Sequence, residues 1–282
     1  MMVSDRFCSA ISCRSKTSLR TRPLKTCPEH PSPLSRRPPM ADTLPDLPED
    51  ALLPDGARAA TLSLEALERI RQDIVAGALK PDTKLHLGSM RARYGVGLSP
   101  LREALSRLAA DGLVSFSGQR GFRVAPVSRA DLVDITRSRQ IIEGAALRLA
   151  IACGGDDWEA EIVTSHHLLR RATERHLGAG DDAGWAAWEE RHRAFHAALV
   201  SACPLNALKG FRALLYDKAE RYRRLMLAGP FRAEEVSAEH DLLRDAVLAR
   251  DPDRAVGVLE EHIAITADLL DAELVRMEAS GS

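Results

Sequence analysis

The chain has 282 residues, of which 45% are hydrophobic and 28% are charged, and its net charge is −1. This size and composition suit one large or two modest soluble domains, and no apolar run approaches the roughly 20 residues of a membrane-spanning helix. Three of the five cysteines fall in the first 30 residues, which argues against a disulfide framework and favours a reducing compartment. We therefore expect a cytoplasmic protein.

Residues 1–60 differ in composition from the rest of the chain. They are rich in Pro, Ser and Arg, lack helical periodicity and include the sequence PEHPSPLSRRPPM. Such a segment buries too little apolar surface to offset its chain entropy, so we predict a disordered leader without a function. Its Arg- and Ser-rich beginning superficially resembles a transit peptide, but Met40 as the natural start of the protein is the simpler interpretation.

Charge is distributed unevenly along the remaining residues. Residues 61–128 hold 10 Lys and Arg against 6 Asp and Glu, whereas residues 129–282 hold 20 against 27. The first segment is therefore basic and the second acidic. This division predicts that only the first segment contacts a polyanion.

Three helical patterns occupy most of the basic segment. Apolar residues recur at helical spacing from Leu64 until Gly77, and a second helix is expected over residues 88–94. The stretch YGVGLSPLREALSRLAADGLV then breaks at two glycines and continues as a strongly helical run with one apolar face. We expect Ser99 to cap this third helix, with Pro100 at its first position.

A β-hairpin is predicted directly after the third helix. Apolar residues alternate in LVSFSGQRGFRV on both sides of a turn that contains Gln119 and Arg120. Three helices followed by such a hairpin are typical of a winged helix-turn-helix. We expect the third helix to enter a DNA major groove, with Arg102 near bases or phosphates and Arg120 on the backbone or minor groove. The alternatives are solvated surface arginines and a three-helix unit that binds protein.

The motifs DIVAGALKPDTKL, YGVGLSPLREALSRLAADGLV and GQRGFRVAPVS resemble the winged-helix domain of GntR-family bacterial transcription regulators. The branch resembled has an all-helical C-terminal FCD domain, and the chain is most similar to its carbon-starvation-induced repressor type over about residues 64–275. The family commonly places an arginine where this chain has Leu98, so we expect a different operator. The predicted DNA-contacting residues are Leu98, Ser99, Arg102, Ser106, Gln119, Arg120 and Gly121.

Residues 129–277 predict one helix after another, without strands or a phosphate-binding loop. An amphipathic segment, DLVDITRSRQIIEGAALRLAIACGG, comes first. We therefore expect a mainly α protein, with a winged helix-turn-helix over residues 61–128 and an all-α bundle of six or seven helices over residues 129–277. The further helices are expected near residues 156–177, 182–203, 205–228, 232–250 and 252–277.

Four histidines of this acidic segment lie on apolar helical stripes. His192 and His196 are four residues apart and share one helical face, while His240 and His262 belong to two other helices. Hydrogen-bonded core histidines are the alternative, but burying four imidazoles is costly unless they share a partner such as a divalent metal. Zinc is our expectation, with Ni, Mn or Fe as alternatives. The other histidines, His30, His86, His166, His167 and His176, are interpreted as surface or leader residues.

The resemblance extends to this predicted metal site. Many FCD domains hold a metal through one Asp and three His, and His196, His240 and His262 match the three histidines, whereas His192 stands at the Asp position. The site lies at the floor of the effector pocket in related domains, which implies a small carboxylate effector on the metal.

Two further effector contacts and a dimer are also implied by the resemblance. Arg139 matches an Arg of a family motif and could meet a second carboxylate, and Tyr222 is a weaker candidate. A surface salt bridge with Glu143 is the alternative for Arg139. The family further implies a homodimer on a two-fold symmetric DNA operator.

These observations predict a ligand-responsive repressor that is not an enzyme. An acyl-CoA- or lipid-responsive regulator without a working metal is one alternative. A metal-dependent hydrolase with a DNA-binding module is the other, although Arg193 stands where an HExxH protease needs a glutamate.

Overall fold

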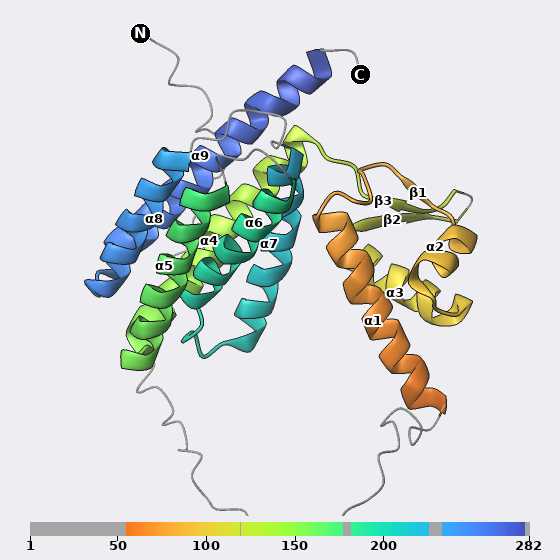
Figure 1. The fold of residues 1–282 in the computed structure, drawn as a ribbon, viewed down its shortest axis with the longest axis horizontal. Coiled ribbons are helices and arrows are strands. Elements are labelled where there is room, and N and C mark those ends of the chain that lie inside the picture. The colour runs from red at the N-terminus through yellow and green to blue at the C-terminus, as the bar shows by residue number, and fades with distance from the viewer. Residues whose placement is uncertain (1–54, 119, 177–181, 226–232, 280–282) are drawn as a thin grey trace, which may run out of the picture. The chain divides into compact units, whose positions relative to one another are not determined.

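The computed structural model describes residues 55–118, 120–176, 182–225 and 233–279, which belong to one unit of the chain, Met40–Ser282. It is mainly helical with one small sheet, so the predicted fold class is confirmed. In chain order the elements are α1 (Asp55–Val75), β1 (Lys84–Leu85), α2 (Leu87–Tyr94), α3 (Leu98–Ala110), β2 (Val114–Ser117), β3 (Gly121–Val124), α4 (Arg129–Cys153), α5 (Asp156–His176), α6 (Asp182–Ala198), α7 (Asn206–Leu225), α8 (Ala233–Leu248) and α9 (Pro252–Ala279) (Figure 1).

The elements α1 to β3 form the predicted winged helix-turn-helix. Its sheet is antiparallel, with β3 between β1 and β2. β2 and β3 are the predicted hairpin, in which Val114 pairs with Val124 and Phe116 with Phe122. Figure 1 shows this sheet next to α2 and α3. β1 was not predicted, because two residues are too few to show an alternating pattern.

The start of α3 differs from the prediction. The helix begins at Leu98, and Gly97 takes the N-cap position in an extended conformation with φ −66° and ψ 167°. Ser99 therefore lies inside the helix and does not cap it, because the Gly97 carbonyl already accepts the first helical hydrogen bond, from the amide of Leu101. Pro100 falls in the first turn, where a missing N–H group is tolerated. The fully buried stripe of α3 is Leu101, Ala104, Leu105 and Leu108.

The first helix begins earlier than predicted. α1 starts at Asp55, so residues 55–60 are helical although they belong to the segment predicted to be disordered. The helix continues from there into the predicted apolar stripe. The remainder of the predicted leader lies outside the described residues. Among the residues that are described, no helix is both long enough and apolar enough to cross a membrane.

The elements α4 to α9 form a helical bundle (Figure 1). In the described part of residues 129–279 there are six helices and no strand, as predicted. Large apolar side chains such as Trp158, Trp188 and Phe195 fill the core. Gly144 allows α4 to approach α9 closely, since a Cβ atom at this position would lie only 3.2 Å from Val256. This packing places α6, α8 and α9, which carry the four candidate metal ligands, around one part of the core.

Candidate metal centre and DNA interface

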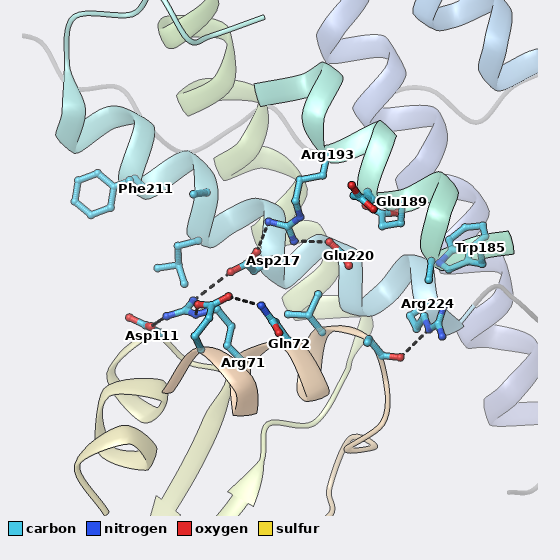
Figure 2. Close-up of a pocket in the computed structure, with 18 of the residues that line it drawn as sticks. Arg71, Gln72, Asp111, Trp185, Glu189, Arg193, Phe211, Asp217, Glu220 and Arg224 are labelled. Atoms are coloured by element: carbon cyan, nitrogen blue, oxygen red, sulfur yellow. Dashed lines mark hydrogen bonds and ion pairs between the residues drawn. The ribbon is translucent and has the colours of Figure 1, made fainter. Parts of the chain in front are cut away.

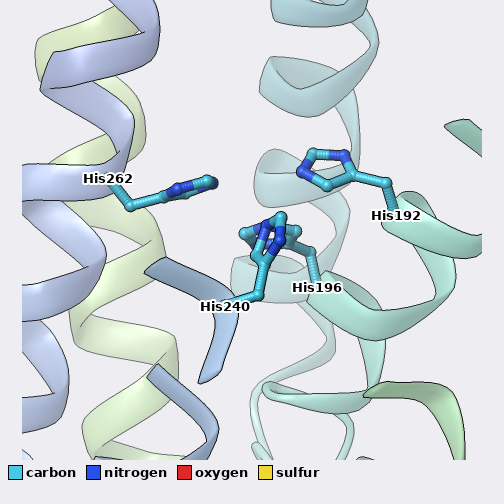
Figure 3. Close-up of side chains that lie close together, drawn as sticks. All are labelled: His192, His196, His240 and His262. Carbon is cyan, nitrogen blue, oxygen red and sulfur yellow. The ribbon is translucent and has the colours of Figure 1, made fainter. Parts of the chain in front are cut away.

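The four histidines proposed as metal ligands meet in the interior of the bundle. His192 and His196 extend from α6, His240 from α8 and His262 from α9, and each is at most 5% exposed. Figure 3 shows the four rings gathered between these helices. Each ring offers a nitrogen that lies within 4.8 Å of those offered by the other three. The structure therefore brings all four together.

Hydrogen bonds determine how two of these rings are protonated. Nδ1 of His262 lies 2.6 Å from a carboxylate oxygen of Glu239, and because that oxygen accepts, Nδ1 is the donor. The hydroxyl of Tyr216 donates to Glu189 at 3.0 Å and lies 2.6 Å from Nδ1 of His192, which must then donate to the hydroxyl oxygen. In both rings Nδ1 is the hydrogen-bonded nitrogen, so Nε2 is the atom available to a metal, which is how a metal-ligating histidine is usually held.

Burial keeps three of the four rings uncharged. Desolvation lowers the pKa of His192 to about 4, against the opposing effect of Glu189. Desolvation, together with the neighbouring histidines, also lowers the pKa values of His196 and His240 well below 6.5. These three imidazoles are therefore neutral at physiological pH, and protons do not compete for the lone pairs that a metal needs.

The four residues fit a divalent metal. Nδ1 of His196 is buried and has no hydrogen-bond partner among the described residues. Buried polar atoms are nearly always paired, so such an atom indicates a missing ligand. Nε2 of His196 and Nε2 of His240 are 3.3 Å apart. Two imidazole nitrogens that bind one metal ion at an angle of about 90–110° lie roughly 2.8–3.4 Å apart, because each metal–nitrogen bond is ~2.0–2.1 Å long, so either ring nitrogen of His196 is a candidate ligand.

A buried ion-pair group that the sequence analysis largely missed lies between α4 and α7. Nε of Arg139 donates to Glu143 at 2.7 Å, and Nε of Arg212 donates to the other oxygen of the same carboxylate at 3.4 Å. All three side chains are at most 6% exposed, so the salt bridge considered for Arg139 exists but is buried. Burial alone would raise the pKa of Glu143, yet the two guanidinium groups hold it below its usual value.

Tyr216 connects this ion-pair group with the histidines. Its ring centre lies 6.0 Å from that of His192 and 6.1 Å from that of His196. The guanidinium carbons of Arg139 and Arg212 lie 5.5 and 4.7 Å from the same ring centre. The sequence around Tyr216 gave no signal for this role, because basic residues surround that helix and obscure its periodicity.

Tyr222 lies apart from the histidines, and the prediction for His166 is wrong. The hydroxyl of Tyr222, a predicted effector contact, lies 2.6 Å from Asp131 and also contacts the backbone of Ser128. Tyr222 is six residues from Tyr216 on the same helix, which turns the two rings to different faces. His166 is not a surface residue, since it is 5% exposed and its Nε2 lies 2.9 Å from Asp241.

A pocket of about 1120 Å³ lies beside α1, α6 and α7, and Figure 2 shows the ion pairs in it. Arg193 pairs with Asp217 at 2.7 Å and also with Glu220, whose pKa burial raises to about 7. Asp217 pairs in turn with Arg71 of α1 at 3.2 Å. Arg71 also pairs at 2.6 Å with Asp111, the residue that ends α3. A continuous set of ion pairs therefore joins α6 and α7 to the end of the third helix.

The outer face of α3 carries the residues predicted to contact DNA. Ser99, Arg102 and Ser106 are all exposed, and Arg102 forms no ion pair with any described residue. Leu98, at the first position of the helix, is 45% exposed. In the hairpin turn, the side chain of Arg120 is exposed and Gly121 has a positive φ of 74°. Gln119 lies outside the described residues.

Comparison with known proteins agrees with this arrangement. Residues 62–124 match the bacterial regulatory proteins of the gntR family, and residues 134–265 match the FCD domain. The chain is 38% identical over 210 residues to the HTH-type transcriptional repressor GlaR of Escherichia coli (strain K12), covering 71% of this chain and 92% of that relative. The chain belongs to the GntR family. It is a DNA-binding transcription regulator of the FCD branch.

Two further comparisons support this assignment. The chain is 39% identical over 213 residues to the HTH-type transcriptional regulator BphR of Paraburkholderia xenovorans, which covers 73% of this chain and 84% of that protein. The solved structure of E. coli McbR/YncC covers 76% of this chain and 98% of its own, with a TM-score of 0.66 and 23% identity. That regulator therefore shares the fold.

Proposed function

We propose that this GntR regulator is a repressor that leaves its operator when a small carboxylate binds beside a metal in the helical bundle. The convergence of four buried histidines within 4.8 Å carries the proposal. Repression is inferred from the relative GlaR, which is named a repressor. Residues 61–128 would form the DNA-binding domain, and residues 129–277 the effector-binding and dimerisation domain; the family matches to residues 62–124 and 134–265 support this division.

In the DNA complex, the N-terminal part of α3 would lie in the major groove. Arg102 is exposed and unpaired among the described residues, so its guanidinium group is available for a base edge or a phosphate. Arg120 and Gly121 in the hairpin turn would contact the backbone or the minor groove. The apolar side chain of Leu98 can recognise only an apolar group, and thymine offers the one methyl group in the major groove. The remaining proposed contacts are Ser99, Ser106 and Gln119.

The metal would be held by Nε2 of His192 and His262 and by one ring nitrogen each of His196 and His240. Neutral imidazoles with bonded Nδ1 atoms suit zinc, with Ni, Mn or Fe(II) as other occupants. When bound, the metal supplies positive charge that attracts a carboxylate. The chain's own contribution is to bury the ligands, which keeps His192, His196 and His240 neutral, and to orient two of the four rings by hydrogen bonds.

Effector binding would reach the DNA-binding elements through the ion pairs of Figure 2. His192 contacts Tyr216, and the guanidinium carbon of Arg193 lies 4.8 Å from the centre of that tyrosine ring. Arg193 continues to Asp217 and from there to Arg71 and Asp111. An effector that binds one arrangement of these contacts more tightly than another shifts the protein between DNA-bound and free states.

The proposal includes a homodimer, a cytoplasmic location at the chromosome and no enzymatic activity. A dimer of winged helices fits a two-fold symmetric operator, as is usual for such regulators. Turnover of esters or amides by metal-loaded protein would instead favour the hydrolase alternative.

Elemental analysis tests the metal directly. Protein exposed to Zn, Ni or Mn and then freed of excess metal should retain about one ion per chain, and chelator should lower its melting temperature. His196→Ala should lose both effects, whereas His167→Ala, which changes an exposed histidine on α5, should lose neither. Wild-type protein that retains no metal and melts identically with chelator would show that the histidines only fill the core.

A further inference from the structure

The pocket beside α1, α6 and α7 has an excess of negative charge. Its volume is about 1120 Å³, and the described residues that line it include six carboxylates but only three guanidinium groups. The carboxylates are those of Glu68, Asp111, Glu189, Glu190, Asp217 and Glu220, and the guanidinium groups are those of Arg71, Arg193 and Arg224. A pocket with this balance attracts a cation.

The ion pairs inside the pocket do not remove this excess. Arg193 pairs with both Asp217 and Glu220, and Arg71 pairs with both Asp217 and Asp111 (Figure 2). Two guanidinium groups therefore serve three carboxylates. One negative charge of this row has no guanidinium group of its own.

The uncompensated charge is concentrated at Glu220. Its side chain is 12% exposed, and among the described residues it forms an ion pair with Arg193 alone. Burial and the nearby Glu189 raise the pKa of Glu220 to about 7, against the opposing effect of Arg223 and Arg193. A cation that approaches Glu220 would therefore stabilise its ionised form.

An apolar wall lies next to these carboxylates. Trp185 lines the pocket one helical turn before Glu189 on α6, so the two side chains lie on one face of the helix. Val75, Ala76 and Ala186 line the same pocket. An aromatic ring beside a carboxylate suits an organic ammonium group, because the ring attracts the positive charge and also covers the attached hydrocarbon.

We propose that this pocket is a second effector site and that it binds a small organic ammonium compound. The ammonium group donates to the carboxylate of Glu220, and the hydrocarbon part packs against Trp185. The site is separate from the metal centre, since no histidine is among the described residues that line it. Its ion pairs extend through Arg71 to Asp111 at the end of α3, so the ligand should change the affinity for the operator.

A matched amine and alcohol test the site on the full-length protein. Isothermal titration at pH 8 compares 2-phenylethylamine with 2-phenylethanol, which has the same skeleton but no charge. The amine should bind at least about tenfold more tightly, as expected of a charge-assisted hydrogen bond. Glu220→Gln should bring the two affinities within about threefold of each other. Glu174→Gln, which changes an exposed carboxylate of α5, should keep the preference.

A second variant tests the location without changing any charge. Ala186 is exposed and lines the pocket, so Ala186→Phe should fill the pocket and weaken amine binding at least about tenfold. Ala160→Phe, at an exposed position of α5, should not weaken it. If Glu220→Gln does not fold, this pair of variants carries the same test.

The pH dependence of amine binding identifies the carboxylate. A primary amine stays charged between pH 6 and 8, as lysine does. Its affinity for the wild type should therefore fall by up to about tenfold as the pH drops through 7 and Glu220 takes up a proton, and this fall should be absent in Glu220→Gln. The other charged groups that line the pocket are Glu189, Glu190 and Arg193 on α6, Asp217 and Arg224 on α7, Glu68 and Arg71 on α1, and Asp111.

Four results would overturn the proposal. The first is equal affinity for the amine and the alcohol, and the second is an amine preference that survives both Glu220→Gln and Ala186→Phe. The third is amine binding that chelator abolishes, which would assign the amine to the metal centre. The fourth is an operator affinity that saturating amine leaves unchanged, which would exclude an effector. None of these results bears on carboxylate binding at the metal.

Discussion

Removing the hydrogen bond between Glu239 and His262 should weaken metal binding without removing a ligand. Glu239 accepts from Nδ1 of His262 at 2.6 Å and thereby holds Nε2 toward the other histidines. Losing such an outer partner typically costs about 10–100-fold in metal affinity. We expect this loss in Glu239→Gln, because the neutral amide no longer polarises the imidazole.

The expected change in stability follows from mass action. Free metal at 100 times its Kd stabilises the folded state by about 2.7 kcal/mol, and after a 10–100-fold loss of affinity by only about 1.4 to 0.4 kcal/mol. For a folded region of this size, about 1 kcal/mol shifts the melting temperature by roughly 2–4 °C. Metal-loaded Glu239→Gln should therefore melt roughly 3–9 °C below wild type, while the two metal-free proteins should melt close together.

Competition with a chromogenic chelator gives the Kd, and calorimetry gives the melting temperatures. Glu261→Gln is the matched control, since it removes an exposed carboxylate next to His262 in sequence. Metal binding by Glu239→Gln as tight as that of wild type would contradict this prediction. An equal loss of stability in the metal-free and metal-loaded variant would also contradict it, because Glu239 would then act on the fold alone.

The other predictions concern pH, DNA and coupling. Burial lowers the pKa of His192 to about 4, whereas the same imidazole in an unfolded chain takes up its proton near pH 6.5. The free energy of unfolding of the metal-free protein should therefore fall as the pH drops from 6.5 to 4, because the unfolded state binds more protons in this range. Urea titrations at several pH values across this range should show that fall. Arg102→Ala should weaken binding to the operator by roughly 1–3 kcal/mol more than it weakens binding to random DNA. Equal losses of affinity for both DNAs would indicate that Arg102 contacts only phosphate. Uracil lacks the methyl group of thymine, so replacing the thymine that Leu98 contacts by uracil should weaken wild-type binding about fourfold. The same replacement should have no effect on binding by Leu98→Ala. Asp217→Asn should reduce the free energy of coupling between effector binding and DNA binding by roughly 0.5–2 kcal/mol. This coupling is measured as the change in DNA affinity that the effector causes. Unchanged coupling would show that the ion pairs of Figure 2 do not transmit it.

The sequence predicted the histidine cluster because helical periodicity assigns each residue to a face. His192 and His196 share a face at four-residue spacing, and the stripes of the other two helices also point inward. Periodicity states only that a side chain is buried, however, and not what it contacts. His166 was placed on the surface because it matches no family motif, although its bonded Nε2 lies in the interior beside Asp241.

The partners of the site were harder to predict, since they depend on how helices pack and on which buried charges pair. Arg212 and Glu143 are 69 residues apart, and no local pattern links them. Tyr216 and Tyr222 occur in one arginine-rich helix, and only the packing of that helix decides that Tyr216 contacts the histidines while Tyr222 contacts Asp131. Charged residues are normally evidence of a solvated face, so buried arginines are the group that sequence patterns assign least well.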